Sequence, residues 1–408
     1  MGKGLITIYT NNRTTQVNFV QPQHNNDQKW IGAWGASQLK PYAFGISQIG
    51  FKNQTVRMIV HPHASGSEIR LRFSNIFGTK PLTFGKVNVA LASNGPKTVL
   101  GSDYQVTFSG ELSITIPVGE EVFSDPIPFE FKEGENLTIS VFLPHHTGPT
   151  TWHTFGMQTT YISTEGDYTT DHDASSFTKS EESWFWLSGV DVLSKDKNAR
   201  VIVTLGDSIT DGFNSELDAN HRYPDYLDER LKDKFNEEYS VLNAGISGNR
   251  ILQDDEMLGE KALERLDRDV LSQTGVTDVI FLQGINDIRF PPHNYNTEQI
   301  IAGMKTIANK VHDKGLRIYG GTLLPYRGTD NYTEEGEVTR NRVNTWIRSS
   351  GVFDGVIDFE KALADPNDPD KLLPDYDSGD HVHPNDAGYK AMAEAIDLSI
   401  FNPGKEII

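Results

Sequence analysis

The sequence predicts an α/β chain in which a domain of antiparallel β-strands precedes a domain built on a parallel sheet. Over residues 30–195, short stretches alternate between apolar and polar positions, which is the period of a strand with one buried face. Over residues 196–408, continuous apolar strands alternate with helical stretches, as in folds with a parallel sheet. We therefore expect a β-sandwich or jelly-roll domain, then a flavodoxin-like domain with five strands. Residues 1–29 form a polar segment before both.

The front domain carries the two-residue period in several separate stretches. Clusters of Gly, Ser and Thr separate these stretches, and several short strands at this spacing are typical of an antiparallel sandwich. The stretches are Thr55–His61, Glu68–Ser74, Lys86–Ala92, Leu112–Ile116 and Leu137–Leu143. The segment before residue 30 is rich in Asn and Gln, and we expect it to be irregular or loosely attached.

The second domain alternates between strand and helix along its whole length. The expected strands are Arg200–Leu205, Ser240–Asn243, Asp278–Gln283, Arg317–Leu324 and Gly355–Phe359. The expected helices are Tyr223–Phe235, Lys261–Leu271, Thr297–Lys314, Glu337–Ser349 and Asp386–Phe401. This alternation implies right-handed crossovers and a parallel sheet covered on both faces.

Composition excludes several classes of protein. The net charge of -19, without a basic run, argues against a nucleic-acid partner. The absence of cysteine excludes disulfides and a thiolate nucleophile. No apolar run approaches the roughly 18–20 residues that cross a bilayer, so we expect no membrane insertion. The N-terminus lacks the long apolar core of a signal peptide, and we expect a cytoplasmic protein.

Polar residues follow four of the expected strands or their connections. Ser208 lies in GDSIT, Gly248 in NAGISGNR, Asn286 in QGINDI, and Asp380 with His383 in SGDHVHPND. The carboxyl ends of parallel strands meet at one edge of a sheet, which is where ligands bind in such folds. We therefore expect these four polar sites to converge.

The converging residues have the chemistry of a serine hydrolase. Ser208 supplies a nucleophile, and Asp380 and His383 lie close enough in sequence to form a hydrogen bond. Asp380 would hold the Nδ1–H of His383, so that Nε2 faces Ser208. The backbone N–H groups of Ser208 and Gly248 and the side-chain amide of Asn286 would stabilise an oxyanion. This chemistry needs no cofactor and no metal.

Three alternatives remain open at this point. Asp377 could replace Asp380 as the acid, whereas Asp211 and Asp287 are expected to fix turns and caps. Neighbouring histidines could bind a metal, namely His61 with His63, His145 with His146, and His381 with His383. Tryptophans of the front domain could stack on sugars, but core packing is their more common use; they are Trp30, Trp34, Trp152, Trp184 and Trp186.

The four blocks together resemble the SGNH (GDSL-type) hydrolase family, over roughly residues 199–401. The resemblance implies the same roles as the chemistry does: a catalytic triad of Ser208, Asp380 and His383, and oxyanion donors from Ser208, Gly248 and Asn286. Thr210 stands where a nucleophile elbow, Gly-x-Ser-x-Gly, would have its last glycine, which argues against an α/β-hydrolase. The front domain resembles a β-rich domain of one bacterial subgroup, in Trp30–Ser37, Arg70–Leu82 and Thr151–Ser163.

The expected function is that of a serine esterase acting on small-molecule acyl esters, with acylated carbohydrates as one candidate class. A lipase or lysophospholipase is the alternative within enzymes. A carbohydrate-binding protein that acts through the front domain is the alternative from another class. Because Thr151-Trp152-His153 lies in a loop-like stretch beside a strand, we expect the front domain to border the cleft. The sequence predicts no oligomeric state.

Overall fold

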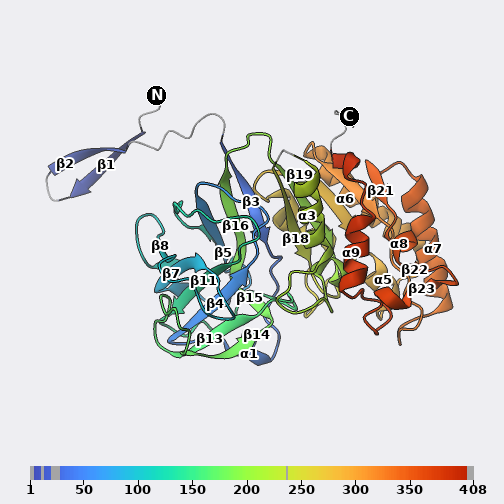
Figure 1. Ribbon diagram of the computed structural model, residues 1–408, viewed down its shortest axis with the longest axis horizontal. Helices are drawn as coiled ribbons and strands as arrows, with labels where there is room; N and C mark the ends of the chain where they lie inside the picture. The colour runs from blue at the N-terminus through green and yellow to red at the C-terminus, as the bar shows by residue number, and fades with distance from the viewer. Residues whose placement is uncertain (1–3, 11–12, 20–27, 236–237, 402–408) are drawn as a thin grey trace.

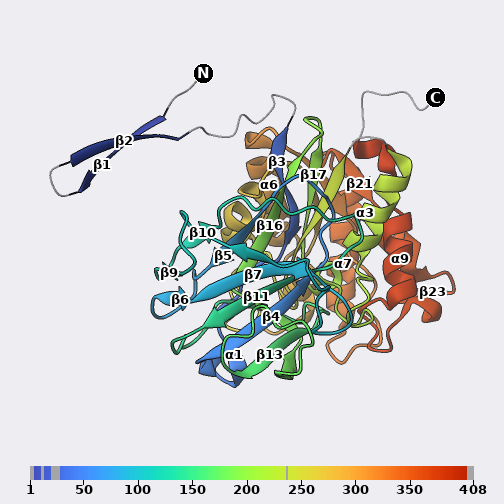
Figure 2. The same ribbon diagram turned by 60° about the vertical axis from the view of Figure 1, so that its left-hand side comes forward.

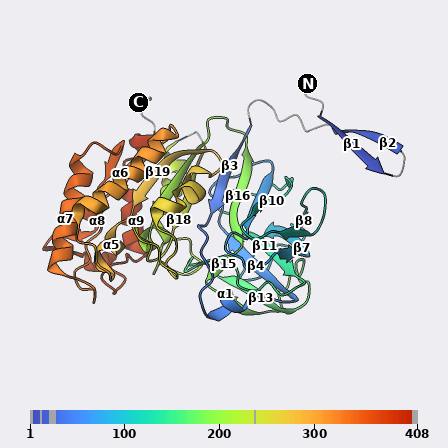
Figure 3. The same ribbon diagram turned by 180° about the vertical axis from the view of Figure 1, so that it is seen from behind.

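A computed structural model describes residues 4–10, 13–19, 28–235 and 238–401 of the protein. The chain forms two parts that lie side by side (Figures 1 and 3). The front part, blue to green, holds the antiparallel strands. The second part, yellow to red, holds a parallel sheet with helices on both faces.

Two antiparallel sheets make up most of the front part. The first has the order β10 (Glu121–Phe123), β5 (Ile69–Ser74), β16 (Leu187–Ser194) and β3 (Lys29–Gly35). The second has the order β14 (Phe177–Glu181), β13 (Thr160–Glu165), β4 (Gln54–Val60), β11 (Leu137–Leu143), β7 (Lys86–Leu91) and β8 (Tyr104–Val106). Smaller elements are the pairs β6 (Leu82–Phe84) with β9 (Ile114–Ile116) and β12 (Trp152–Thr154) with β15 (Ser183–Phe185), and the helix α1 (Gly45–Ile49). All five predicted strand stretches are confirmed, as β4, β5, β7, β9 and β11.

The tryptophans of the front part pack in its core. Trp34, Trp152, Trp184 and Trp186 are all at most 9% exposed. The rings of Trp34 and Trp184 meet edge to face at 5.0 Å, a favourable aromatic geometry. The prediction of core packing is confirmed for these four, while Trp30 is half-buried beside the guanidinium of Arg70.

The second part contains a five-stranded parallel sheet in the order β18 (Tyr239–Gly245), β17 (Arg200–Gly206), β19 (Val276–Leu282), β20 (Arg317–Gly321) and β21 (Gly355–Ile357). This is the 2-1-3-4-5 order of flavodoxin-like folds, so the predicted α/β class and strand number are confirmed. The helices are α2 (Ser208–Asp211), α3 (Tyr223–Lys234), α4 (Ala262–Leu266), α5 (Ile285–Arg289), α6 (Thr297–Asp313), α7 (Glu334–Ser349), α8 (Phe359–Leu363) and α9 (Asp386–Glu394). A short antiparallel pair, β22 (Ala364–Asp365) and β23 (Asp368–Leu372), follows α8.

The long helices pack in pairs on opposite faces of this sheet. In Figures 1 and 3, α3 lies beside α9 on one face, and α6 lies beside α7 on the other. Asn296 caps α6 and Asn385 caps α9, each by accepting a hydrogen bond from a backbone N–H of the first turn. None of the helices among residues 28–235 and 238–401 is both long and apolar enough to cross a bilayer.

The N-terminal segment is expected to be irregular or loosely attached, and the first of these alternatives is wrong for the residues described. Strands β1 (Gly4–Thr10) and β2 (Arg13–Phe19) pair as an antiparallel hairpin, which stands apart from the rest in Figure 2. Both strands are rich in β-branched residues, which favour extended backbone over irregular structure. The expected helical stretch over residues 261–271 is confirmed, and it changes after α4 into a turn of π-helix, Asp267–Leu271.

The two parts meet along β3 and β18, the edge strands of their sheets (Figure 3). The N–H of Gly32 on β3 donates to the carbonyl of Thr274, in the loop before β19. Arg72 donates to the side-chain oxygen of Gln273 at 2.5 Å. Two buried histidine–aspartate pairs cross the same interface. The expectation that the two parts pack together is therefore confirmed.

Candidate active site

Ser208 opens α2 directly after the central strand β17. A Cβ at Gly206 would collide with the Thr210 hydroxyl, so only glycine permits the tight turn from strand to helix. Asp207 caps the helix, since its carboxylate accepts a hydrogen bond from the N–H of Ile209 at 3.1 Å. Burial raises the pKa of Asp207 to about 7. The serine is thus held at the carboxyl edge of the sheet by its own local sequence.

Serine, histidine and aspartate form a continuous chain of contacts at this edge. The Oγ of Ser208 lies 2.7 Å from Nε2 of His383, and Nδ1 of His383 lies 2.5 Å from Oδ2 of Asp380. Asp377 instead pairs with Nδ1 of His381 at 2.6 Å. Asp380, and not Asp377, is the carboxylate that contacts His383, so the structure disfavours the alternative acid.

The Asp380 carboxylate is fixed by several donors. Its Oδ1 accepts from the backbone N–H groups of Val382 and His383 at 3.0 and 2.9 Å, and its Oδ2 accepts from the Asn214 amide at 2.9 Å. Partial burial by itself would raise the pKa of Asp380, but hydrogen bonds and the charge of His383 lower it well below its usual value. The ionised carboxylate orients the imidazole so that Nε2 faces the serine.

The other two predicted residues follow β18 and β19, Gly248 in a loop and Asn286 in the short helix α5. Gly248 has a φ of +77°, and a Cβ there would come within 2.6 Å of the Leu258 side chain, so the position requires glycine. Asn286 lies in α5 and is only 2% exposed. Its Nδ2 donates one hydrogen bond to the carbonyl of Asn249 at 3.1 Å, which leaves the second amide hydrogen for another acceptor.

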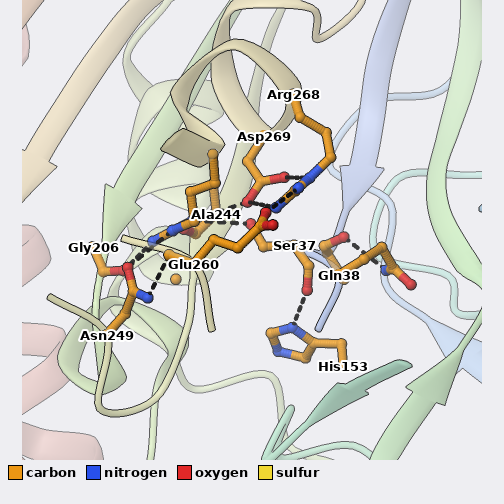
Figure 4. A network of polar contacts seen from close by, with 12 residues as sticks. Ser37, Gln38, His153, Gly206, Ala244, Asn249, Glu260, Arg268 and Asp269 are labelled. Carbon is orange, nitrogen blue, oxygen red and sulfur yellow. Dashed lines mark hydrogen bonds and ion pairs between the residues drawn. The ribbon is translucent and has the colours of Figure 1, made fainter. Parts of the chain in front are cut away.

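Arg265 joins these loops, although nothing in its sequence context distinguished it from an exposed helical charge. The side chain is fully buried and donates to the carbonyls of Gly206 and Ala244, both at 2.8 Å. It also donates to the Asn249 side chain at 2.9 Å, and Asn249 donates in turn to the Glu260 carbonyl (Figure 4). One guanidinium therefore ties the ends of β17 and β18 to the loop that contains Gly248.

Asp211, at the end of α2, links the serine helix to the same loop and to the front part. Its Oδ2 accepts from the N–H and the hydroxyl of Ser247 at 3.1 and 3.0 Å. Its Oδ1 lies 3.0 Å from Nε2 of His153, whose Nδ1 lies 2.7 Å from the carbonyl of Ser37 (Figure 4). An ionised carboxylate and a carbonyl only accept, so these two contacts favour the imidazolium form of His153, in which both ring nitrogens donate. Burial disfavours this charge, yet Asp211 raises the pKa of His153 above its ordinary value.

A second histidine crosses the interface in the same way. Nε2 of His63 lies 3.0 Å from Oδ1 of Asp225, and its Nδ1 lies 2.6 Å from the carbonyl of Val241. Both ring nitrogens of His63 are therefore occupied as donors and cannot bind a metal. Burial lowers the pKa of its neighbour His61 to about 4. The two side chains do not form the metal pair that their spacing allowed.

One other cluster has ligand atoms close together. Within the described parts of the chain, one group of three metal-ligating side chains has its ligand atoms within 4.8 Å of one another. The group consists of Glu216, His221 and Asp386. Nδ1 of His221 is 2.5 Å from Oδ2 of Asp386, at the start of α9. His381 and His383 do not share a ligand position, because each is paired with its own aspartate.

The front part borders the site through an aromatic side chain. The ring of Phe213, just after α2, lies 4.9 Å from the His383 ring, and the ring of Phe155 lies 5.6 Å from that of Phe213. Phe155 directly follows β12, the strand that carries His153. The front part therefore comes within one ring of His383 through Phe155, a residue that sequence reasoning did not find, while the expectation that it borders a cleft stays a prediction.

Fold and site together define an α/β protein of the hydrolase type, with a Ser–His–Asp arrangement at the carboxyl edge of its sheet. Residues 204–391 match the model of the GDSL-like Lipase/Acylhydrolase family. The second part of the chain is therefore similar to GDSL-type hydrolases over residues 204–391, and the protein is assigned to the carboxylic ester hydrolases on this match. No curated protein matches the chain.

The chain is also similar to several solved structures over about half of its length. A GDSL-like lipase from Bacteroides thetaiotaomicron is 19% identical and covers 50% of this chain and 88% of its own, with a TM-score of 0.38. A lipase/acylhydrolase from Enterococcus faecalis is 21% identical and covers 48% and 92%, with a TM-score of 0.38. Est24, a carbohydrate acetylesterase from Sinorhizobium meliloti, is 15% identical and covers 48% and 95%, with a TM-score of 0.39.

Proposed function

We propose that the protein is a serine esterase that hydrolyses small acyl esters, with Ser208, His383 and Asp380 as its catalytic triad. The observation that carries this proposal is the unbroken contact from the Ser208 hydroxyl through the imidazole to the carboxylate, at 2.7 and 2.5 Å. A hydroxyl is a weak nucleophile unless a base removes its proton, and this geometry supplies the base and the group that orients it.

The reaction follows from the positions of the donors and acceptors. Ser208 Oγ attacks the ester carbonyl carbon while His383 Nε2 takes its proton, and Asp380 stabilises the resulting imidazolium. The oxyanion accepts hydrogen bonds from the N–H groups of Ser208 and Gly248 and from Asn286 Nδ2. His383 then protonates the departing alcohol, which leaves an acyl-serine. A water molecule, deprotonated by the same imidazole, releases the acid and restores the serine.

The proposal is tested by replacing the nucleophile and one oxyanion donor. We expect Ser208→Ala to lose about 10⁶ in kcat with 4-nitrophenyl acetate. We expect Asn286→Ala to lose about 10²–10³, the usual effect of one missing donor. Ser349→Ala, at the exposed end of α7, is the matched control and should keep full activity. A folded Ser208→Ala protein with near-wild-type activity would refute the assignment.

We infer that the acyl group is short. The loops at the carboxyl edge carry polar groups, among them Arg250, Arg289 and Arg327. Each methylene of an acyl chain gains about 0.8 kcal/mol only where an apolar wall buries it. We therefore expect kcat/KM to peak between acetyl and butyryl in a series of 4-nitrophenyl esters. A rise through octanoyl and longer chains, with activation at an emulsion surface, would favour the lipase alternative instead.

We also propose that the domain boundary lies near residue 196, with a β-sandwich over residues 30–195 and the hydrolase domain over residues 196–408. The two antiparallel sheets of the front part, with four and six strands, support the sandwich, and both contribute buried apolar residues. Limited proteolysis tests this boundary. We expect the first cleavage to fall between β16 and β17 and not within the sheets of either domain.

A further inference from the structure

A groove of about 460 Å³ opens where the front part meets the segment after α2. Its size lies within the roughly 300–1,000 Å³ typical of small-molecule sites. The front part supplies most of the lining, and the second part supplies Leu217. The lining side chains of the front part include Tyr42, Phe44, Thr154, Phe155 and Glu181. No role in the ester chemistry described above uses this groove.

The groove gathers large apolar side chains that are left unusually exposed. Phe44 is 61% exposed, Leu217 is 40% exposed and Phe155 is 38% exposed. Phe155 also has a φ of +59°, a conformation that a bulky residue adopts only when the surrounding structure imposes it. Exposed apolar groups clustered in this way typically mark a contact surface.

Two ring-to-ring contacts connect the lining of the groove to His383, and hydrogen bonds join the two walls of the groove. Phe155 lines the groove and touches Phe213, which touches His383, at ring distances of 5.6 and 4.9 Å. Asp218, next to Leu217, accepts from the Thr159 N–H at 2.6 Å and from the Thr159 hydroxyl at 2.7 Å. These bonds tie the two walls together, so the groove is formed before any ligand enters.

We propose that this groove binds the alcohol part of the substrate and that this alcohol is a carbohydrate, a proposal that rests on the proposed esterase function. A sugar ring offers an apolar C–H face to Phe44 and Phe155 and hydroxyl groups at its edge. The carboxylate of Glu181 and the hydroxyl of Thr154, both lining the groove, are acceptors for those hydroxyls. An alkyl chain in the same place would desolvate the carboxylate without giving it a donor.

The first test measures binding without turnover. The Ser208→Ala protein is titrated by calorimetry with xylopentaose, mannopentaose and cellopentaose. We expect at least one to bind, and Phe44→Ala in the same background to weaken that binding about tenfold, through loss of one stacking face. Tyr104→Ala is the matched control, because Tyr104 is 43% exposed but lies on the edge strand β8, away from the groove. No binding of any pentasaccharide, or equal binding by Phe44→Ala, overturns the proposal.

The second test separates this proposal from the esterase function itself. We expect Phe44→Ala to lower kcat/KM for the acetylated form of the pentasaccharide that binds in the first test about tenfold more than for 4-nitrophenyl acetate. Equal losses on both substrates overturn the carbohydrate subsite while leaving the esterase function standing. A selective loss on 4-nitrophenyl octanoate assigns the groove to the acyl chain and also overturns it. Failure of the esterase function appears differently, as a wild-type protein that binds a pentasaccharide but hydrolyses neither ester.

Discussion

Replacing His153 with alanine removes a buried positive charge that the front part places against the helix of the nucleophile. His153 and Asp211 are each 2% exposed, and their contact measures 3.0 Å. The other oxygen of Asp211 holds the amide and hydroxyl of Ser247, the residue before the proposed oxyanion donor Gly248. His153 therefore acts on the active site through Asp211 and is a positioning residue.

The size of the effect follows from what the substitution leaves behind. Removing one partner of a buried ion pair typically costs about 3–5 kcal/mol, because the remaining charge stays buried. Ser247 still donates twice to Asp211, so we expect a loss near the lower end, about 3 kcal/mol in the free energy of unfolding. A displacement of about 1 Å in a catalytic group can cost about 10² in rate. We therefore expect kcat with 4-nitrophenyl acetate to fall about 10- to 100-fold.

His63 provides a matched control for this prediction. It also contacts an aspartate and a backbone carbonyl, and its aspartate contact crosses the same interface, but its partner Asp225 lies in α3 and not beside the oxyanion loop. Urea unfolding should show destabilisation in both alanine variants, whereas kcat should fall only in His153→Ala. His153→Gln, which can still donate to Asp211, should recover part of the rate. Unchanged kcat in His153→Ala, or equal falls in both variants, would refute this reasoning.

Further predictions concern pH, the acid, the loops and metal. The pKa values of His63 and His153 are raised in the folded state. The stability that the two histidines contribute is therefore complete below about pH 6.5 and is lost as the pH rises through their pKa values in the folded protein. Urea unfolding at several pH values checks this. Asp380→Asn should lower kcat about 10⁴-fold, whereas Asp377→Asn should retain most activity; equal losses would contradict the assignment. Arg265→Met should lower the unfolding free energy by about 3–5 kcal/mol, as measured in urea, since it leaves buried carbonyls and a carboxylate without their donor. Exhaustive chelation with EDTA should leave esterase activity intact, and recovery of a lost activity by zinc would contradict this.

The parallel sheet and most of the candidate site could be predicted because each depends on short stretches of sequence. A strand followed by Gly-Asp-Ser specifies both the turn and the position of the Ser208 hydroxyl at the edge of the sheet. Asp380 and His383 are three residues apart, so their hydrogen bond forms within one loop. The order of parallel strands then brings such loops to one edge whatever lies between them. A local sequence pattern is therefore sufficient to predict a site residue where the same few residues determine both the backbone turn and the reactive group.

The rest of the site depends on pairings between residues far apart in the chain. His153 and Asp211 are separated by 58 residues and belong to different parts of the molecule. Arg265 and Ser37, which also meet, are separated by 228. A buried charge is stable only beside its partner, and sequence patterns give no sign of that partner until both parts are folded against each other. If these pairs position the oxyanion loop as argued, the hydrolase sequence alone does not encode a complete active site. A fragment starting near residue 197 should then fold poorly or hydrolyse esters slowly, and a fragment with full activity would contradict that conclusion.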